Sequence, residues 1–258
     1  MRTIIGLIKI FLFILFTFFC GLIHFLAIAL IRLFNREQTI WNRKLVRYWA
    51  TVISHIFTIN VNVIGKPPEP PFFLVCNHLS YLDIIPVFLN TKSTFVAKKE
   101  IRKWPFLGFI MEMVGIIFVD RTRKKDVVRV NEELKSACNE HQGIVVFPEG
   151  TTSGGEKVLQ FKPSLLEVPA TEYIQVSYAS IQYETHPNDD LAVNSVCFFG
   201  ARDSFLKHIL KMAENRSIKC TIHFGDDIVQ ANNRKVLAHL LQKKVEEIFL
   251  PTHQSIKT

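Results

Sequence analysis

Residues Phe72–Asp83, FFLVCNHLSYLD, decide how this chain folds. The first five residues form a short apolar run, which is typical of a strand buried in a sheet, and the run ends at Asn77 and His78. Ser80, followed three residues later by Asp83, has the outline of a capping box with aspartate in place of the usual glutamate. The stretch therefore predicts a buried strand, a polar loop and a helix, with a histidine at the carboxyl end of the strand.

The spacing between His78 and Asp83 suits a general base. Asp83 would lie in the first helical turn, where the helix dipole favours its ionised form. Because a loop intervenes, the backbone can turn this carboxylate toward the imidazole, which fixes the tautomer and makes the other ring nitrogen more basic. We expect His78 to take a proton from an alcohol and Asp83 to orient it. The alternative is an ordinary capped helix beside a surface histidine.

Residues Gly143–Ser153, GIVVFPEGTTS, repeat this arrangement: a short apolar strand precedes a Pro-Glu-Gly turn and two threonines. In open α/β sheets, ligands bind beyond the carboxyl ends of the strands, so the two loops are expected to line one site. Threonine hydroxyls and exposed backbone N–H groups suit a phosphate or another anion. For this stretch alone, the alternative is a surface turn that uses glycine and proline for its geometry.

Four segments in this order resemble the glycerophospholipid acyltransferases, the family that includes bacterial lysophosphatidic acid acyltransferase, across roughly Pro67 to Pro251. The segments are His78–Asp83, Phe95–Glu100, Gly115–Arg121 and Phe147–Thr152. The resemblance implies one α/β catalytic domain of the glycerolipid acyltransferase type, with a central sheet flanked by helices. It also implies direct transfer of a fatty acyl group from acyl-CoA or acyl carrier protein to a lysophospholipid, with lysophosphatidic acid giving phosphatidic acid as the leading reaction. No cofactor and no metal are expected.

The resemblance assigns roles to individual residues. It makes His78 and Asp83 catalytic and Lys98 a candidate for oxyanion or donor binding, although Lys98 could equally be a solvated lysine. The expected acceptor-binding residues are Arg121, Glu149, Gly150, Thr151 and Thr152. For Glu149 the alternative is a structural role, capping a turn or pairing with Arg121.

The chain departs from the family pattern where the acceptor is expected to bind. Many members carry arginine after Glu-Gly-Thr, whereas this chain has Thr152, whose hydroxyl cannot supply a fixed cationic fork, so Arg121 is expected to take that role. Tyr178 stands at the position that aligns with a proline in the family's fourth block. The loop Thr151–Ser153 and the following Val158–Leu165 are similar to a subgroup that includes lyso-ornithine lipid acyltransferases.

These departures leave three functions open. Acylation of lysophosphatidic acid is the leading one, and acylation of lyso-ornithine or another lysolipid is a variant of it. The third is a lipid-binding membrane protein without catalysis, which the presence of both His78 and Asp83 opposes.

The segment Trp104–Met111, WPFLGFIM, is unusually apolar for a stretch between polar motifs. An acyltransferase needs a place for a fatty chain, and we expect this segment to line it; core packing is the alternative. The candidates for the acyl tunnel are Trp104, Phe106, Leu107 and Phe109.

The N-terminus is expected to anchor the chain to a membrane. Residues Ile10–Ile31 make an apolar stretch of about 20 residues, enough to cross a bilayer core, and no cleavage pattern of small residues follows. Either a spanning helix or shorter segments dipping into one leaflet would fit, and the resemblance favours the second. The expected divisions are residues 1–36 as the anchor, 37–66 as an amphipathic basic connection and 67–258 as the catalytic domain.

Charge helps to place the catalytic domain. The formal net charge is +8, and the excess of basic residues after the apolar run favours a cytoplasmic catalytic domain, expected at a bacterial inner membrane. Residues Gln38–Ile59 would form a helix that either lies against anionic lipid or packs as an ordinary core helix. From Lys92 to Arg129 there are ten basic residues against four acidic ones, which would attract lipid headgroups, CoA phosphates or acidic carrier protein. No pattern typical of nucleic-acid binding occurs, so no nucleic-acid partner is expected.

The five cysteines are widely spaced and odd in number, which predicts reduced packing residues, and no metal-ligand spacing is evident. No internal repeat divides the catalytic part, so one core is expected. The expected strands are Val61–Ile64, Phe72–Cys76, Gly115–Val119, Ile144–Phe147, Gln175–Ile181, Ala192–Phe199 and Ile218–Phe224. The expected helices are Ile84–Leu89, Lys125–His141 and Arg234–Phe249.

Overall fold

The computed structural model describes residues 2–34, 38–103, 108, 111, 115–119, 124–200 and 203–252. The helices are α1 (Arg2–Leu33), α2 (Gln38–Ile56), α3 (Ile84–Asn90), α5 (Lys124–Ala137), α6 (Glu167–Thr171), α7 (Ala192–Ser195), α8 (Phe205–Ala213) and α9 (Arg234–Ile248). The strands are β1 (Ile59–Ile64), β2 (Phe73–Cys76), β3 (Ser93–Lys98), β4 (Ile117–Val119), β5 (Gly143–Val146), β6 (Val176–Thr185) and β7 (Ile218–Phe224). Short 3-10 turns are η1 (Tyr81–Asp83), η2 (Lys99–Lys103) and η3 (Pro163–Leu165).

The strands form one seven-stranded sheet in the order β1-β7-β6-β2-β5-β3-β4. Neighbouring strands run parallel except β6 and β7, which are antiparallel. All four residues of β2 are buried, which explains its unbroken apolar sequence, because a central parallel strand is covered on both faces. The parallel neighbours β2 and β5 end at the same edge of the sheet. This brings together the loop after Cys76, called the first loop below, and the loop after Val146, called the second loop.

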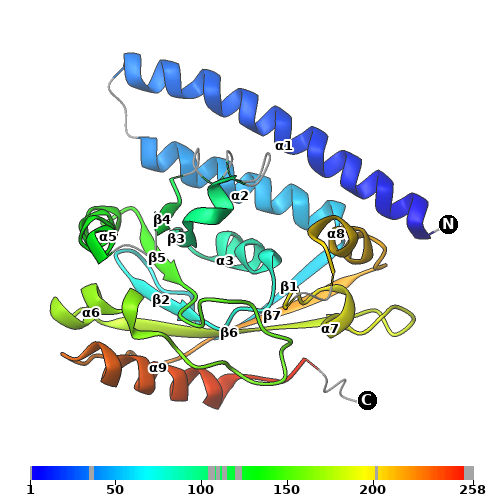
Figure 1. The fold of residues 1–258 in the computed structure, drawn as a ribbon. Helices are drawn as coiled ribbons and strands as arrows, with labels where there is room; N and C mark the ends of the chain where they lie inside the picture. The colour runs from blue at the N-terminus through cyan, green and yellow to red at the C-terminus, as the bar shows by residue number, and fades with distance from the viewer. Residues whose placement is uncertain are drawn as a thin grey trace.

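Helices cover both faces of the sheet (Figure 1). One core packs α2, α3 and α8 against one face of the sheet, and a second core packs α5, α6 and α9 against the other. The α/β class with a central sheet flanked by helices is therefore confirmed.

Helix α1 lies along α2 and α8 over the upper layer (Figure 1). It is long and apolar enough to cross a membrane by length and composition, and only 17% of its most apolar window is buried. Its buried residues are Gly6, Thr17, Cys20 and His24. The last three follow helical spacing and so share one face, while most of the remaining apolar surface of α1 is exposed.

Polar contacts tie α1 to the rest of the protein along its length. Near its start, Arg2 donates to the carbonyl of Asn188 at 2.8 Å and forms an ion pair with Asp189. Farther along, the indole N–H of Trp49 donates to Thr17 Oγ1 and that of Trp41 to His24 Nδ1, each at 3.2 Å. Both Trp41 and Trp49 belong to α2, so the polar face of α1 rests on a helix that itself covers the sheet.

The structure corrects one element that the sequence predicts. Ala192–Phe199 was expected to be a strand, but Ala192–Ser195 forms α7, and the following turn is closed by hydrogen bonds from Val196 N and Cys197 N to Ala192 O. Positions four apart in this stretch are buried, which is the spacing of a helical turn rather than of a strand. The strand β3 and the helix α8 were not predicted.

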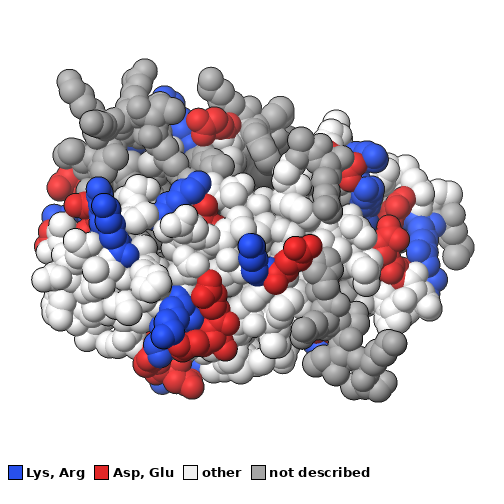
Figure 2. All heavy atoms as spheres, turned by 60° about the horizontal axis from the view of Figure 1, so that its bottom comes forward, with Lys and Arg blue, Asp and Glu red and all other residues white. Residues whose placement is uncertain are grey.

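Charges on the α9 face are mixed rather than of one sign. Figure 2 shows basic and acidic side chains next to one another there, separated by uncharged surface. Ion pairs of this half of the protein include Arg234 with Glu167 and Lys244 with Asp227. Of the basic cluster predicted between Lys92 and Arg129, much lies outside the described residues, and Lys92 pairs with Glu69.

Candidate active site

The backbone before His78 is fixed by a buried asparagine. Asn77 follows β2, and its side-chain amide donates to the carbonyl of Ile181 at 2.9 Å and accepts from the N–H of Ile181 at 2.7 Å. The side chain thus mimics a peptide group and extends the pairing of β2 with β6 by one step. His78 comes directly after this anchored position.

His78 and Asp83 are in contact. His78 Nδ1 lies 2.7 Å from Asp83 Oδ2, which places the ring proton on Nδ1 and the lone pair on Nε2. The imidazole stacks on Phe147 with ring centroids 4.2 Å apart. The His78 side chain is 21% exposed, and its Nε2 makes no hydrogen bond to the described part of the chain. An imidazole held in this way can accept a proton at Nε2.

Asp83 is completely buried, and its carboxylate is surrounded by donors. In addition to His78, the backbone N–H groups of Leu79 and Ser80 donate to Oδ2 at 2.7 and 3.1 Å. The hydroxyl of Tyr183 donates to Oδ1 at 2.9 Å. The bond from Ser80 is the backbone half of the predicted capping box. Because every partner donates, the arrangement suits an ionised carboxylate.

The second loop holds the backbone of His78 from both sides. The N–H of His78 donates to Glu149 Oε1 at 3.0 Å, and the carbonyl of His78 accepts from the N–H of Ser153 at 2.8 Å. Glu149 is buried, and this burial raises its pKa to about 8 despite backbone hydrogen bonds from His78 and Leu159. Its Oε2 has no hydrogen-bond partner among the described residues. The two predicted loops therefore meet at His78.

The rest of the second loop turns toward solvent and then closes on the C-terminal segment. Gly150 has a φ of +70°, Thr151 is exposed and Thr152 is half-buried. Farther on, the carbonyl of Gly155 accepts from the N–H of Thr252 at 2.8 Å. Gly155 has a φ of +76°, and a Cβ there would lie 2.2 Å from Thr252 Oγ1, so this close approach requires glycine.

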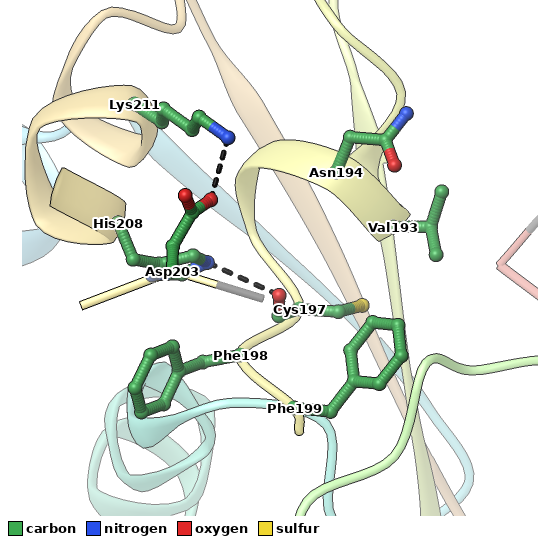
Figure 3. A pocket seen from close by; sticks show the side chains of 8 residues that line it. All are labelled: Val193, Asn194, Cys197, Phe198, Phe199, Asp203, His208 and Lys211. Atoms are coloured by element: carbon green, nitrogen blue, oxygen red, sulfur yellow. Dashed lines mark hydrogen bonds and ion pairs between the residues drawn. The ribbon is translucent and has the colours of Figure 1, made fainter. Parts of the chain in front are cut away.

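A cavity of about 220 Å³ adjoins the first loop, between the α7 segment and α8 (Figure 3). Phe198 donates its N–H to the carbonyl of Leu79, and Tyr81 OH lies 3.0 Å from Nδ1 of His208, which lines the cavity. Nε2 of His208 lies 3.1 Å from the carbonyl of Cys197. Burial lowers the pKa of His208, which favours a neutral ring that donates at Nε2 and accepts at Nδ1. The first loop is thus braced from this side as well.

Other predicted site residues cannot be placed. Lys98 ends β3, but its side chain is outside the described residues, as is Arg121. The four tunnel candidates, Trp104, Phe106, Leu107 and Phe109, are also outside them. Their roles stay predictions.

Tyr183, which contacts Asp83 from a strand far along the chain, was not among the predicted site residues. The available signal was weak: a tyrosine within an apolar strand needs a hydrogen-bond partner once it is buried. Within the described ranges, no group of three or more His, Cys, Asp or Glu side chains could hold a metal ion.

Comparison with known proteins agrees with this fold and this pair of loops. Residues 59–180, which contain both loops, match the family model described as Acyltransferase. This part of the chain is therefore similar to the acyltransferase family.

Individual proteins are similar to the chain over different extents. The chain is similar to lyso-ornithine lipid O-acyltransferase of Brucella abortus, with 25% identity over 84% of this chain and 86% of the relative. It is also similar to 1-acyl-sn-glycerol-3-phosphate acyltransferase of Neisseria gonorrhoeae, with 32% identity over 46% of this chain and 48% of the relative. The crystal structure of the LPA acyltransferase PlsC from Thermotoga maritima shares the fold, with a TM-score of 0.59 and 22% identity over 96% of this chain and 98% of that one.

Proposed function

We propose that this protein is an O-acyltransferase that moves a fatty acyl group from a thioester to the free hydroxyl of a lysolipid. The observation that carries the proposal is the contact between His78 and the buried Asp83, which directs the lone pair of Nε2 away from the carboxylate. The family match over both loops supports this chemistry. Acyl-CoA or acyl carrier protein would be the donor, and the reaction requires no metal or other cofactor.

In the proposed reaction, His78 Nε2 accepts the proton of the acceptor hydroxyl while that oxygen attacks the thioester carbonyl carbon. The carbon–sulfur bond then breaks, and the imidazolium returns the proton to the departing thiolate. No acyl-enzyme forms. Proton transfer by a positioned base contributes roughly 10²–10⁴-fold to the rate. Lys98 and backbone N–H groups of the two loops are the candidates to stabilise the tetrahedral oxyanion.

For the acceptor, lysophosphatidic acid is the leading candidate, with phosphatidic acid as the product for phospholipid synthesis. The match to 1-acyl-sn-glycerol-3-phosphate acyltransferases at 32% identity supports it. Glu149, Gly150, Thr151 and Thr152 would form the acceptor side of the site, together with Arg121.

A second acceptor, lyso-ornithine lipid, is favoured by a different observation. Relatives with that name match 84% and 88% of this chain, whereas the Neisseria relative matches 46%. The half-buried Thr152, which stands where many family members carry arginine, also suits an acceptor without a phosphate.

We propose further that α1 lies in one leaflet instead of crossing the bilayer. A helix of 32 residues is roughly 48 Å long, more than the hydrocarbon thickness, so crossing would carry one end to the far side. Yet Arg2, at the start, contacts Asn188, and His24, near the other end, contacts Trp41. Contacts of both ends with one domain favour a helix embedded by its exposed apolar face, with the catalytic domain on the cytoplasmic side of a bacterial inner membrane.

The test of the activity is acyl transfer by purified protein in detergent. Lysophosphatidic acid and lyso-ornithine lipid are offered in parallel, each with acyl-CoA and with acyl carrier protein. We expect His78→Ala to abolish turnover and His239→Ala, which changes an exposed histidine on α9, to retain it. Full activity of His78→Ala would refute the proposed site, and the preferred lysolipid identifies the acceptor.

The test of the membrane arrangement is cysteine labelling from one side of the membrane. The five native cysteines are buried or half-buried, so a new cysteine at position 2 or 239 should dominate labelling by an impermeant maleimide. We expect Arg2→Cys and His239→Cys to be labelled from the same side. Labelling of position 2 from the opposite side would show that α1 spans the bilayer.

A further inference from the structure

Tyr183 connects the sheet to the buried carboxylate of the site. It lies in β6, its side chain has no exposed surface, and its hydroxyl is 2.9 Å from Asp83 Oδ1. The two residues are 100 positions apart in the sequence, so only the fold brings them together.

The two oxygens of Asp83 are held differently. Oδ2 accepts three hydrogen bonds, from His78 Nδ1 and from the N–H groups of Leu79 and Ser80. In the described part of the chain, Oδ1 has the hydroxyl of Tyr183 as its hydrogen-bond donor. Tyr183 therefore holds the second oxygen, and together with the three donors on Oδ2 it fixes the rotation of the carboxylate about its bond to Cβ.

We infer that Tyr183 is a positioning residue of the acyl-transfer reaction, one that orients Asp83 and, through it, the base His78. The inference rests on the proposed function, because it assumes that His78 takes the proton of the acceptor. Tyr183 does not touch the reacting atoms. Its hydroxyl acts by withdrawing part of the carboxylate's charge and by holding the carboxylate in one orientation.

The other titratable groups near Asp83 do not change between the variants used below, so a variant at position 183 changes only the hydrogen bond from Tyr183. Burial raises the pKa of Tyr183 well above its ordinary value, so the hydroxyl remains a donor across the working pH range. The charge of Asp83 also acts on three thiols, those of Cys76, Cys197 and Cys220; burial first and this charge second raise the pKa of each, so they stay uncharged. Glu149, on which the charge of Asp83 also acts, is unchanged in every variant used below.

The chain offers a matched control on the same strand. Tyr178 is also a buried tyrosine of β6, and its hydroxyl also bonds a carboxylate, that of Asp227. Tyr178 and Tyr183 are an odd number of positions apart, so they point to opposite faces of the sheet. Although Tyr178 stands among the departures from the family pattern, its side chain packs in the core under α9 and not in the core that holds Tyr183. Removing either hydroxyl therefore makes a similar chemical change, but only Tyr183 contacts the site.

The test compares Tyr183→Phe with Tyr178→Phe in the full-length protein, using the pH dependence of acyl transfer. Without the Tyr183 hydroxyl, Asp83 keeps more of its charge and holds the protonated imidazole more strongly. As the pH is lowered, His78 therefore becomes protonated, and activity falls, at a higher pH than in the parent. We expect the acid limb of kcat/KM to move up by about half a pH unit to one unit and kcat to fall about tenfold, with little change in acceptor KM. Tyr178→Phe should keep the parent pH profile and kcat, whatever its effect on thermal stability.

A second variant decides the question if Tyr183→Phe does not fold. Site-specific 3-fluorotyrosine at position 183 keeps the ring and hydroxyl but makes the hydroxyl a stronger donor, so the acid limb should move to lower pH. An unchanged acid limb in both position-183 variants, or in the fluorinated one alone if the other is unfolded, would overturn the inference. If His78→Ala is as active as the parent, the proposed function fails and the inference with it. If His78→Ala is inactive and the limb is unmoved, the inference alone fails.

Discussion

Asp83 and Glu149 are two carboxyl groups of one site, equally hidden from solvent but held differently. Their relative exposures are 0% and 1%, and both accept hydrogen bonds from backbone N–H groups of the first loop. Asp83 has donors on both oxygens, whereas Glu149 Oε2 has none among the described residues. Burial, with a smaller contribution from the neighbouring charge of Asp83, raises the pKa of Glu149 to about 8. The two groups therefore differ in the number of donors rather than in the depth of burial, and the group with a donor-free oxygen is the one whose pKa is raised.

This difference suits two roles in one site. An ionised Asp83 can fix the tautomer of His78 and stabilise the imidazolium that forms during proton transfer. An uncharged Glu149 beside it adds no second negative charge, which would otherwise repel an anionic headgroup or the developing oxyanion. The predictions below test each half of this contrast.

The largest effect is expected from Asp83→Asn. The amide keeps the shape of the side chain but removes its charge and can present a donor to Nδ1, so the lone pair needed at Nε2 is lost. We expect kcat to fall by about 10²–10⁴ with the fold retained, measured as acyl transfer to the preferred lysolipid. Asp227→Asn, on the other face of the sheet, should leave kcat unchanged. Equal activity of the two variants would remove Asp83 from the mechanism.

Glu149→Gln should change how stability depends on pH. The raised pKa means that, between about pH 4.5 and 8, unfolding releases a proton that the native carboxyl retains, so the parent becomes less stable as pH rises. For this one group the loss approaches about 1.4 kcal/mol of unfolding free energy per pH unit in that window. Glutamine cannot ionise, so the variant should gain stability relative to the parent from about pH 5 to about pH 8, measured by urea unfolding in detergent.

The control for that measurement is Glu247→Gln, an exposed position on α9. It should follow the parent across the same pH range. If Glu149→Gln also follows the parent, Glu149 is ionised in the folded protein and the contrast with Asp83 is wrong.

Gly155→Ala should loosen the second loop where it closes on the C-terminal segment. Its φ of +76° and the close approach of Thr252 both oppose a side chain, so we expect a loss of more than about 1 kcal/mol in unfolding free energy. Combining Gly155→Ala with Thr252→Ala should recover the part of this free-energy loss that is due to crowding, but not the part that is due to the positive φ. Thermal unfolding of the parent, the two single variants and the double variant measures this. If the two single losses in unfolding free energy add up to that of the double variant, the contact between Gly155 and Thr252 is not the cause.

The smallest effect is expected from Thr152→Arg. Position 152 in the second loop is half-buried, so an arginine there could pair with a phosphate while both groups stay partly exposed to solvent. Because such pairs are screened, we expect about a threefold rise in kcat/KM for lysophosphatidic acid relative to lyso-ornithine lipid. Thr151→Arg, at the exposed neighbouring position, is the control and should change this ratio less.

Much of this architecture could be predicted from short sequence patterns. The strand at Phe73–Cys76, the strand at Gly143–Val146 and the polar loops after them are local features, and parallel pairing then brings the loops to one edge. The class of fold followed from alternating strand and helix signals. Strand order could not be predicted, because the antiparallel pairing of β6 with β7 and the placement of β1 beside β7 depend on contacts between distant segments.

The site shows the same division. The approach of Asp83 to His78 is set within five positions of sequence, so spacing and helix geometry were enough to suggest it. Tyr183, which bonds Asp83, and Ile181, which pairs with the Asn77 side chain, both lie in β6, about a hundred positions away, and no local pattern marks these contacts. Ala192–Phe199 was misread because an apolar run of that length fits a strand or a buried helical turn equally well.

The contact between Gly155 and Thr252 has a consequence for how the protein is made. The second loop is synthesised long before the segment that closes it, since Thr252 lies near the C-terminal end of the described chain. During synthesis the N-terminal part emerges first, so α1 is available to a membrane while the loop still lacks its partner. A nascent chain would therefore reach the membrane before it has a finished site, and a chain cut short before residue 252 would leave that loop open on an otherwise complete sheet.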